Sequence, residues 1–461
     1  MNGHRYNPPH PGYFISQTSK VDPTEMSKEQ LKKRVLEAID NHAAEITEIG
    51  DTIWKNPELG YKEFKTAKLV ESKYEEMGWT YENKIAITGS KAYLKQPGPR
   101  PTIGIIGELD SVRCPEHPDA DPITGAVHAC GHNAQIAAML GAGIGLTDSG
   151  VLDELEGNVV MVTVPAEEYL EIDYRNNLRE KGELEFLGGK QEFIHLGALA
   201  DIDISLGTHS GTDLEDKLRV GGSNNGFIGK LVRYIGLEAH AGAAPDRGIN
   251  ALNAAMLGIM GIHAQRETFR EEDAIRVHPI ITKGGEIVNN VPADVRIESY
   301  VRGKTVDAII DANEKVNRAL KAGAMAVGAE VEISDIPGYM PYTHHQELDA
   351  VLRENCAALV GDDKVKEGEH STGSTDMGDI SCIMPTSSIG MGGVTGQGHG
   401  RTYQIVDKKL EYITPAKVLA LACIDLLHDN AAKAREIIGS YKPSILPEEY
   451  TDFMRMMVEE P

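Results

Sequence analysis

The sequence has little cysteine, a deficit of positive charge and no long apolar run. Its five cysteines are scattered over 461 residues, odd in number and without Cys-X-X-Cys spacing, which is typical of a reducing cytoplasm and excludes a disulfide framework. The net charge of −24 argues against nucleic acid and anionic membrane surfaces as partners. No run approaches the ~18 apolar residues that span a bilayer, and residues 1–40 contain no apolar segment of secretory type. We therefore predict a cytoplasmic protein that binds neither nucleic acid nor membrane.

Three apolar stretches end in polar residues suited to chemistry. "PTIGIIGELD" leads to Glu108 and Asp110, "GNVVMVTVPAEE" to Glu167 and Glu168, and "DIDISLGTHSG" to His209. Each stretch is typical of a buried strand, and helical patterns separate them. This alternation predicts an α/β fold with a doubly wound, mostly parallel sheet, whose ligands gather at the carboxyl ends of the strands.

Helix signals flank these strands. A capping box at Ser27 and Gln30 predicts one long amphipathic helix that continues to Trp54. Further helices are expected at about 63–77, after "HACGHN", at about 306–327 and at about 415–428. The first 25 or so residues, rich in proline, glycine and polar groups, are expected to be an irregular arm.

The chain length predicts more than one domain. "GGSNNG", beginning at Gly221, is typical of a joint, and after it come two helical patterns and longer alternating strands. We expect a smaller α+β domain of two helices and an antiparallel sheet, inserted into the larger one. The predicted boundaries are 1–221 and 334–461 for the two parts of the catalytic domain, and 222–333 for the inserted dimerisation or lid domain.

"HACGHN" contains the residue types that bind zinc and similar ions. Cys130 and His132 can face one point if the backbone turns at Gly131. Alternatively, the motif is only a glycine turn before a buried helix. Likewise, Glu167 and Glu168 could form a solvated acidic turn.

Two further histidines have the same ambiguity. His209 ends an apolar strand, His399 lies in the glycine-rich "GVTGQGHG", and a lone histidine is more often structural than a ligand. Together, however, Cys130, His132, Glu168, His209 and His399 supply more ligands than one closed tetrahedral site needs. They suit two adjacent divalent ions that share a bridging carboxylate or thiolate.

Eight motifs in order resemble one known family. They are "NPELGYKEFKTA", "GELDS", "HACGHN", "VPAEE", "GTHSG", "EAHAGAAPDRGINAL", "NNVPADV" and "GSTDMGD". The sequence resembles the aminoacylase/carboxypeptidase-type metallopeptidases, in particular the amidohydrolase branch of aminobenzoyl-glutamate hydrolase, hippurate hydrolase and the indole-acetyl-amino-acid hydrolases. The resemblance covers about residues 29–428.

The resemblance implies a role for each matching residue. Cys130, His132, Glu168, His209 and His399 match the metal ligands, Glu167 the general base, and Asp110 a carboxylate that orients a ligand histidine. His240 matches a histidine that reaches the partner subunit's site and holds the developing oxyanion, which implies a homodimer through the inserted domain. Asn290 and Arg302 match positions of the small domain near the substrate. Binding of a substrate carboxylate by either is less strongly implied, and Arg247 is a competing candidate for it.

The sequence also departs from the family pattern at three places. Glu108 stands where the peptidase relatives carry a metal-binding histidine, and Asn133 replaces a common aspartate. The charged stretch 169–191 is longer than expected and predicts either a pocket rim or a solvated helix.

These observations predict a metal-dependent amidohydrolase that cleaves the amide bond of an N-acyl (aroyl) amino acid or a similar small amide. Two divalent ions per subunit, zinc or manganese before cobalt or nickel, would activate a water, and Glu167 would take its proton. The alternatives are a dipeptidase of the same fold, which an acidic pocket rim would favour, and a metal-poor scaffold without activity.

Overall fold

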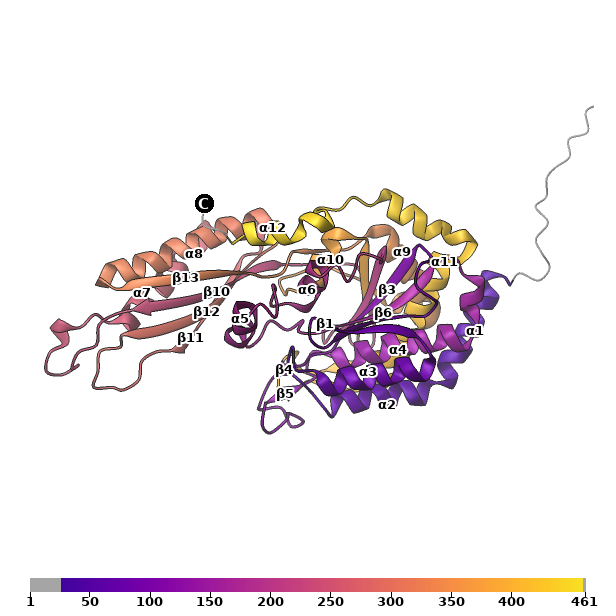
Figure 1. Cartoon of the computed structure of the whole chain (residues 1–461), viewed down its shortest axis with the longest axis horizontal. Helices are drawn as coiled ribbons and strands as arrows, with labels where there is room; N and C mark the ends of the chain where they lie inside the picture. Colours follow the sequence, from indigo (N-terminus) through magenta and orange to yellow (C-terminus); the bar gives the residue numbers. More distant parts are fainter. Residues whose placement is uncertain (1–25, 459–461) are drawn as a thin grey trace, which may run out of the picture.

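The computed structural model describes residues 26–458, so the predicted N-terminal arm lies outside the described residues. Its larger part (Figure 1) is built on an eight-stranded sheet. The strand order is β1-β2-β6-β3-β7-β17-β8-β15. The four strands in the middle of this order, β6, β3, β7 and β17, are all parallel to one another. Antiparallel pairs occur where β2 meets β6, where β1 meets β2 and where β8 meets β17. The predicted mostly parallel α/β sheet is confirmed.

The strands of this sheet have the following bounds: β1 (Thr80–Ile85), β2 (Gly89–Tyr93), β3 (Thr102–Glu108), β6 (Asn158–Val164), β7 (Ile204–Ser210), β8 (Leu218–Val220), β15 (Val365–Glu367) and β17 (Thr386–Met391). The larger part contains the helices α1 (Lys28–Asn41), α2 (Ala43–Trp54), α3 (Phe64–Met77), α4 (His132–Asp148), α5 (Ile172–Glu180), α6 (Gly189–His195), α9 (Gln346–Val360), α10 (Met377–Ile383), α11 (Thr414–Ser440) and α12 (Tyr450–Met456).

Both faces of the sheet are buried at its centre, where every residue of β3 and β6 is buried, which explains why these strands are continuous apolar runs. Side chains alternate across the sheet, so Ile103 and Ile105 of β3 pack with α1, α2, α4 and α11 in one core cluster. Ile106 faces the other side and joins a second cluster with residues of α6, α10 and α12. This double layer fixes the strand ends on which the site is built.

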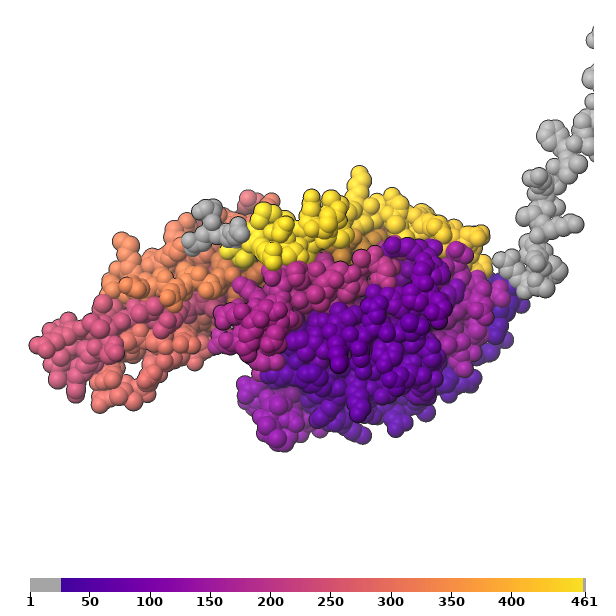
Figure 2. Space-filling model, viewed as in Figure 1, coloured from indigo at the N-terminus to yellow at the C-terminus, as the bar shows by residue number. Residues whose placement is uncertain are grey.

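The smaller part is a four-stranded antiparallel sheet with the order β11-β12-β10-β13. Its elements are β10 (Gly226–Ile235), α7 (Ala251–Ala264), β11 (Arg276–Lys283), β12 (Asp294–Gly303), α8 (Val306–Val327) and β13 (Glu330–Pro337). Helices α7 and α8 pack on one face around a core cluster of their own. This part, called the lid below, extends as a narrower projection from the larger body (Figures 1 and 2).

Short strands complete the fold. They are β4 (Val112–Arg113), β5 (Ala126–Val127), β9 (Ser223–Asn224), β14 (Tyr342–Thr343), β16 (His370–Ser371), β18 (Val394–Thr395) and β19 (Gln404–Ile405). Within residues 26–458, no helix is long and apolar enough to cross a membrane.

Two helix predictions need correction. The predicted helix from Ser27 to Trp54 has its capping box, but it is broken at His42 into α1 and α2, because His42 has non-helical backbone angles. The helix predicted to end at His428 continues to Ser440 after a kink at 428–431. In both places tertiary packing continues on each side of a local break, which an apolar periodicity does not reveal.

Candidate metal centre and substrate pocket

The carboxyl ends of three neighbouring strands place most of the polar residues together. Strand β3 lies between β6 and β7 and runs parallel to both. Glu108 is the last residue of β3, with Asp110 just beyond it. Glu167 and Glu168 follow β6, and His209 is the second-last residue of β7. Because parallel strands end at one edge of the sheet, these side chains converge.

The N-terminus of α4 brings Cys130 and His132 to the same edge. The turn between them is at Gly131, which has a positive φ of 84°. A Cβ atom at Gly131 would lie 2.1 Å from Ser210 Oγ, so close packing as well as backbone conformation requires glycine here. The loop after β18 contributes His399, on the exposed side of the cluster.

The structure brings all five predicted ligands together in two groups that share Cys130. One group contains Cys130, His132 and His209, and the other contains Cys130, Glu168 and His399. Cys130 Sγ lies 3.4 Å from His209 Nε2 and 3.3 Å from His399 Nε2, while His399 Nε2 lies 3.1 Å from Glu168 Oε1. A third group joins His132 to Glu108 and Glu167. Thiolate, imidazole and carboxylate within this range form a donor set suited to divalent ions.

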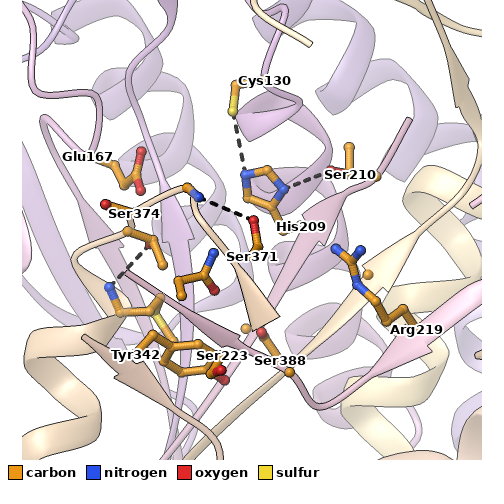
Figure 3. Close-up of a pocket in the computed structure, with 18 of the residues that line it drawn as sticks. Cys130, Glu167, His209, Ser210, Arg219, Ser223, Tyr342, Ser371, Ser374 and Ser388 are labelled. Atoms are coloured by element: carbon orange, nitrogen blue, oxygen red, sulfur yellow. Dashed lines mark hydrogen bonds between the residues drawn. The ribbon is translucent and has the colours of Figure 1, made fainter. Parts of the chain in front are cut away.

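The Nδ1 atoms of two histidines form hydrogen bonds with the backbone, which leaves their Nε2 atoms available to bind a metal. His132 Nδ1 donates to the carbonyl oxygen of Asp110 at 2.9 Å, and His209 Nδ1 donates to that of Ser210 at 2.7 Å. The Nε2 lone pairs therefore face the cluster, as is usual for metal-ligating histidines. Figure 3 shows the His209 ring between Cys130 and Ser210. His132 Nε2 and Glu168 Oε1 are buried without a hydrogen bond, which fits a cation.

The neighbouring charges of the cluster lower the pKa values of Cys130 and Glu168. Burial and the charge of Glu168 oppose ionisation of the Cys130 thiol, but His209 and His132 outweigh them and lower its pKa to about 6. Burial likewise opposes ionisation of Glu168, whereas His399 lowers the pKa of that carboxyl to about 2. The thiolate and the carboxylate are therefore the stable forms near neutral pH, and these are the forms that bind metals.

The surroundings of Glu167 change its pKa in the opposite direction. Burial, and then the charges of Glu108 and Glu168, raise its pKa well above the ordinary value. Its carboxyl oxygen Oε2 lies 3.9 Å from His132 Nε2. Adjacent glutamates with divergent pKa values suit a division into ligand and proton acceptor.

Asp110 holds the backbone of both glutamates. Its two carboxylate oxygens accept the amide hydrogens of Glu167 and Glu168 at 3.1 and 2.9 Å. Its Oδ1 also lies 3.3 Å from His132 Nδ1. One buried carboxylate therefore orients residues of both the β6 loop and α4.

Sequence reasoning missed a buried ion network behind the cluster. The ammonium of Lys190, on α6, is fully buried between Glu108, at 2.6 Å, and Asp376. Glu108 Oε2 also accepts a bond from Gln135 at 2.6 Å and lies 3.0 Å from His132 Nε2. Asp376 belongs to the quoted "GSTDMGD", but nothing local in the sequence links it to Lys190.

A pocket of about 1020 Å³ lies beside the cluster, between the sheet edge and the base of the lid. Arg302 of β12 lines it, together with Cys130, Glu167 and His399. The Arg302 guanidinium donates to Ser374 Oγ at 2.9 Å and lies over the rings of Phe227 and Tyr300. Among the described residues, it has no carboxylate partner.

The other three lid residues predicted to serve the site lie elsewhere in this chain. His240, Asn290 and Arg247 are exposed and do not line the pocket. His240 and Asn290 pair with each other through an isolated β-bridge. The structure of one chain thus leaves them away from the metal cluster.

The chain matches one known protein family over most of its length. The model of peptidase family M20/M25/M40 matches residues 104–421. The chain belongs to this family. It is therefore a metal-dependent hydrolase acting on amide or peptide bonds, and the predicted family and enzyme class are confirmed.

Relatives of this M20 protein include a dipeptidase and an amino acid hydrolase that is not named as a peptidase. It is 27% identical to a mouse Xaa-Arg dipeptidase, over 77% of this chain and 78% of the relative. It is 26% identical to the Arabidopsis thaliana IAA-amino acid hydrolase ILR1-like 4, over 74% of this chain and 75% of the relative.

Solved structures share the fold of this M20 protein. The Bacillus subtilis protein YXEP, described as a dinuclear metal binding peptidase, superimposes with a TM-score of 0.59 at 20% identity, covering 87% of this chain and 99% of YXEP. The Klebsiella pneumoniae aminobenzoyl-glutamate utilization protein gives 0.63 at 18% identity, covering 85% and 98%. Both support the predicted combination of a large α/β part and a smaller lid.

Cys130 provides a test of the metal centre. We expect chelator-treated protein at pH 7 to be alkylated at one thiol per chain, because the Cys130 pKa is about 6 and the other four cysteines are buried. Reloading divalent ions should slow this reaction by at least ~10-fold. Mass spectrometry locates the label, and Cys130→Ser is the control. Equal labelling with and without metal would contradict a thiolate ligand.

Proposed function

We propose that this protein hydrolyses the amide bond of N-acyl amino acids at two divalent ions. The observation that carries the proposal is the pair of ligand groups sharing Cys130, with the high-pKa carboxyl of Glu167 beside them. Cys130, His132 and His209 would hold one ion, and Cys130, Glu168 and His399 the other. Zinc or manganese are the proposed ions, and the thiolate favours zinc. The dinuclear relative supports the number of ions.

When bound, the ions would polarise the scissile carbonyl and increase the acidity of a water. The protein's part is to move the proton. Glu167 takes it from the attacking water and returns it to the leaving amine, and its raised pKa suits both transfers. Asp110 keeps the Glu167 backbone in place through the two amide hydrogen bonds that it accepts.

Arg302 is the proposed binding site for the substrate carboxylate. Its guanidinium is half-buried, faces the pocket beside the cluster and has no carboxylate partner among residues 26–458. Stacking on Phe227 and Tyr300 fixes its plane, which suits a bidentate contact. An amino acid with a free α-carboxylate on the leaving side of the amide would meet this requirement.

A dipeptidase is the second candidate, because the mouse relative is named for that activity and the outer pocket is partly acidic. Asp213, Glu367 and Glu369 line that outer part, although Arg219 and Lys366 lie among them. Asp213 pairs with Arg219 at 3.4 Å, so Glu367 and Glu369 are the acidic groups of the outer pocket that would meet a free ammonium. Turnover of acetyl- or benzoyl-amino acids beside the matching unblocked dipeptides separates the two candidates.

We also propose that the chain forms a homodimer through its lid, which would be the unit inserted at about residues 222–333. Strand β11 is a sheet edge, and Ile280 and Ile281 on it are exposed. Met256 and Met260 of α7 add exposed apolar surface on the same part. A second chain would bring the partner's His240 to the pocket, which this chain's own His240 does not line. The partner residue would then stabilise the developing oxyanion.

Glu167→Gln should remove the proton acceptor while leaving the ligands in place. We expect kcat for an N-acyl amino acid to fall by roughly 10²–10⁴-fold with metal content unchanged. Glu171→Gln is the matched control, because Glu171 follows closely but pairs with Lys62 on the outside. Near-normal turnover of the Glu167 variant would disprove the assignment of the general base.

The dimer proposal predicts complementation between two inactive variants. Glu167→Gln and His240→Ala chains, co-expressed with different affinity tags and isolated as mixed dimers, should show about half of wild-type activity per dimer. One of the two sites then combines an intact Glu167 with an intact His240 from the other chain. Inactive mixed dimers would show that His240 does not act across the interface.

A further inference from the structure

The four residues that carry the glutamate pair, 166–169, form a turn held in an unusual conformation. Ala166 has a φ of 54° and Glu171, just beyond the turn, a φ of 49°. Neither is glycine, so the surrounding structure must stabilise these left-handed conformations. On the amide side, Glu63 accepts from Ala166 at 2.9 Å, and Asp110 accepts from Glu167 and Glu168. All of these acceptors lie in the larger part of the molecule.

The carbonyl side of the same turn is held mainly by tyrosine hydroxyls. The hydroxyl of Tyr339 donates to the carbonyl oxygen of Glu167, and that of Tyr300 donates to the carbonyl oxygen of Tyr169. Tyr300 belongs to lid strand β12, and Tyr339 follows β13 where the chain leaves the lid. The hydroxyls therefore come from the lid and its exit segment, one on each side of Glu168.

The two tyrosines belong to a packed joint between the two parts. Tyr169 forms edge-on contacts with Phe227, Tyr300 and Tyr339 at centroid distances of 5.1, 5.9 and 5.4 Å. Phe227 begins the lid on β10, so the entry and exit of the lid chain meet at Tyr169. The guanidinium of Arg175 on α5 donates hydrogen bonds to the carbonyl oxygens of Ala166 and Leu187. The stretch 169–191, whose role the sequence leaves open, thus packs at this joint (Figure 1).

We propose that Tyr300 and Tyr339 are positioning residues that hold the 166–169 turn so that the carboxyl of Glu167 faces the pocket. Loss of either hydroxyl leaves a backbone carbonyl of a strained turn without its partner. The turn would then relax, displacing the proton acceptor relative to the substrate. Arg302 lies over the Tyr300 ring, so the proposed carboxylate contact and the clamp on the glutamates share one lid strand. The inference rests on the proposed role of Glu167.

Tyr300→Phe and Tyr339→Phe test the proposal, because each keeps the ring and removes only the hydroxyl. We expect kcat for an N-acyl amino acid to fall by about three- to tenfold in each variant, with a larger loss in the double variant. KM should stay within about twofold and metal content should be unchanged. This separation of kcat from KM is not expected from a merely structural role.

Tyr234→Phe is the matched control. Tyr234 is a buried lid tyrosine whose hydroxyl donates to the carbonyl oxygen of Leu320 at 2.9 Å, within the lid. We expect it to lower the melting temperature without lowering kcat. The proposal is overturned if both tested variants keep wild-type kcat, if the losses follow loss of metal, or if Tyr234→Phe lowers kcat equally. An active Glu167→Gln variant would instead overturn the proposed function, so the two failures are distinguishable.

Discussion

The metal centre buries four carboxyl groups beside one thiol, and the surrounding structure must balance their charge. Glu108, Glu167, Glu168 and Asp376 are all buried within one region, and isolated buried charges of one sign are very unfavourable. Behind the sheet edge, the single ammonium of Lys190 pairs with both Glu108 and Asp376 and offsets part of their charge. On the pocket side, Glu168 and Cys130 lie beside histidines, and the buried His132 Nε2 without a hydrogen bond fits a cation there. The charge distribution therefore requires Lys190 behind the sheet edge and metal ions in front of it.

The fold meets this requirement by convergence of strand ends. Parallel β3, β6 and β7 bring residues separated by about a hundred positions to one edge, and helix α4 starts there at a glycine that no other residue could replace without displacing Ser210. The lid adds the Arg302 guanidinium to the pocket, and the lid with its exit segment adds the two tyrosine hydroxyls bound to the glutamate turn.

Much of this arrangement could be predicted from the sequence, because the relevant signals are local. The apolar runs ending at Glu108, Glu168 and His209 identify buried strands, and their shared chemistry identifies the edge at which they meet. Lys190, Asp376 and the tyrosine hydroxyls were not predictable in this way, since each acts through a partner distant in sequence. The break at His42 was missed for a related reason, because apolar periodicity continues through it. For His240, the structure of a single chain does not contain the contact that the family resemblance implies.

We propose that the Cys130 thiolate is shared by two divalent ions. X-ray absorption at the metal edge of zinc-loaded protein detects such sharing. We expect a sulfur ligand at ~2.3 Å and a second metal at roughly 3.5–4 Å, with the sulfur signal lost in Cys130→Ser. A fully loaded protein with no sulfur ligand, or with a spectrum that the Cys130 substitution leaves unchanged, would contradict it.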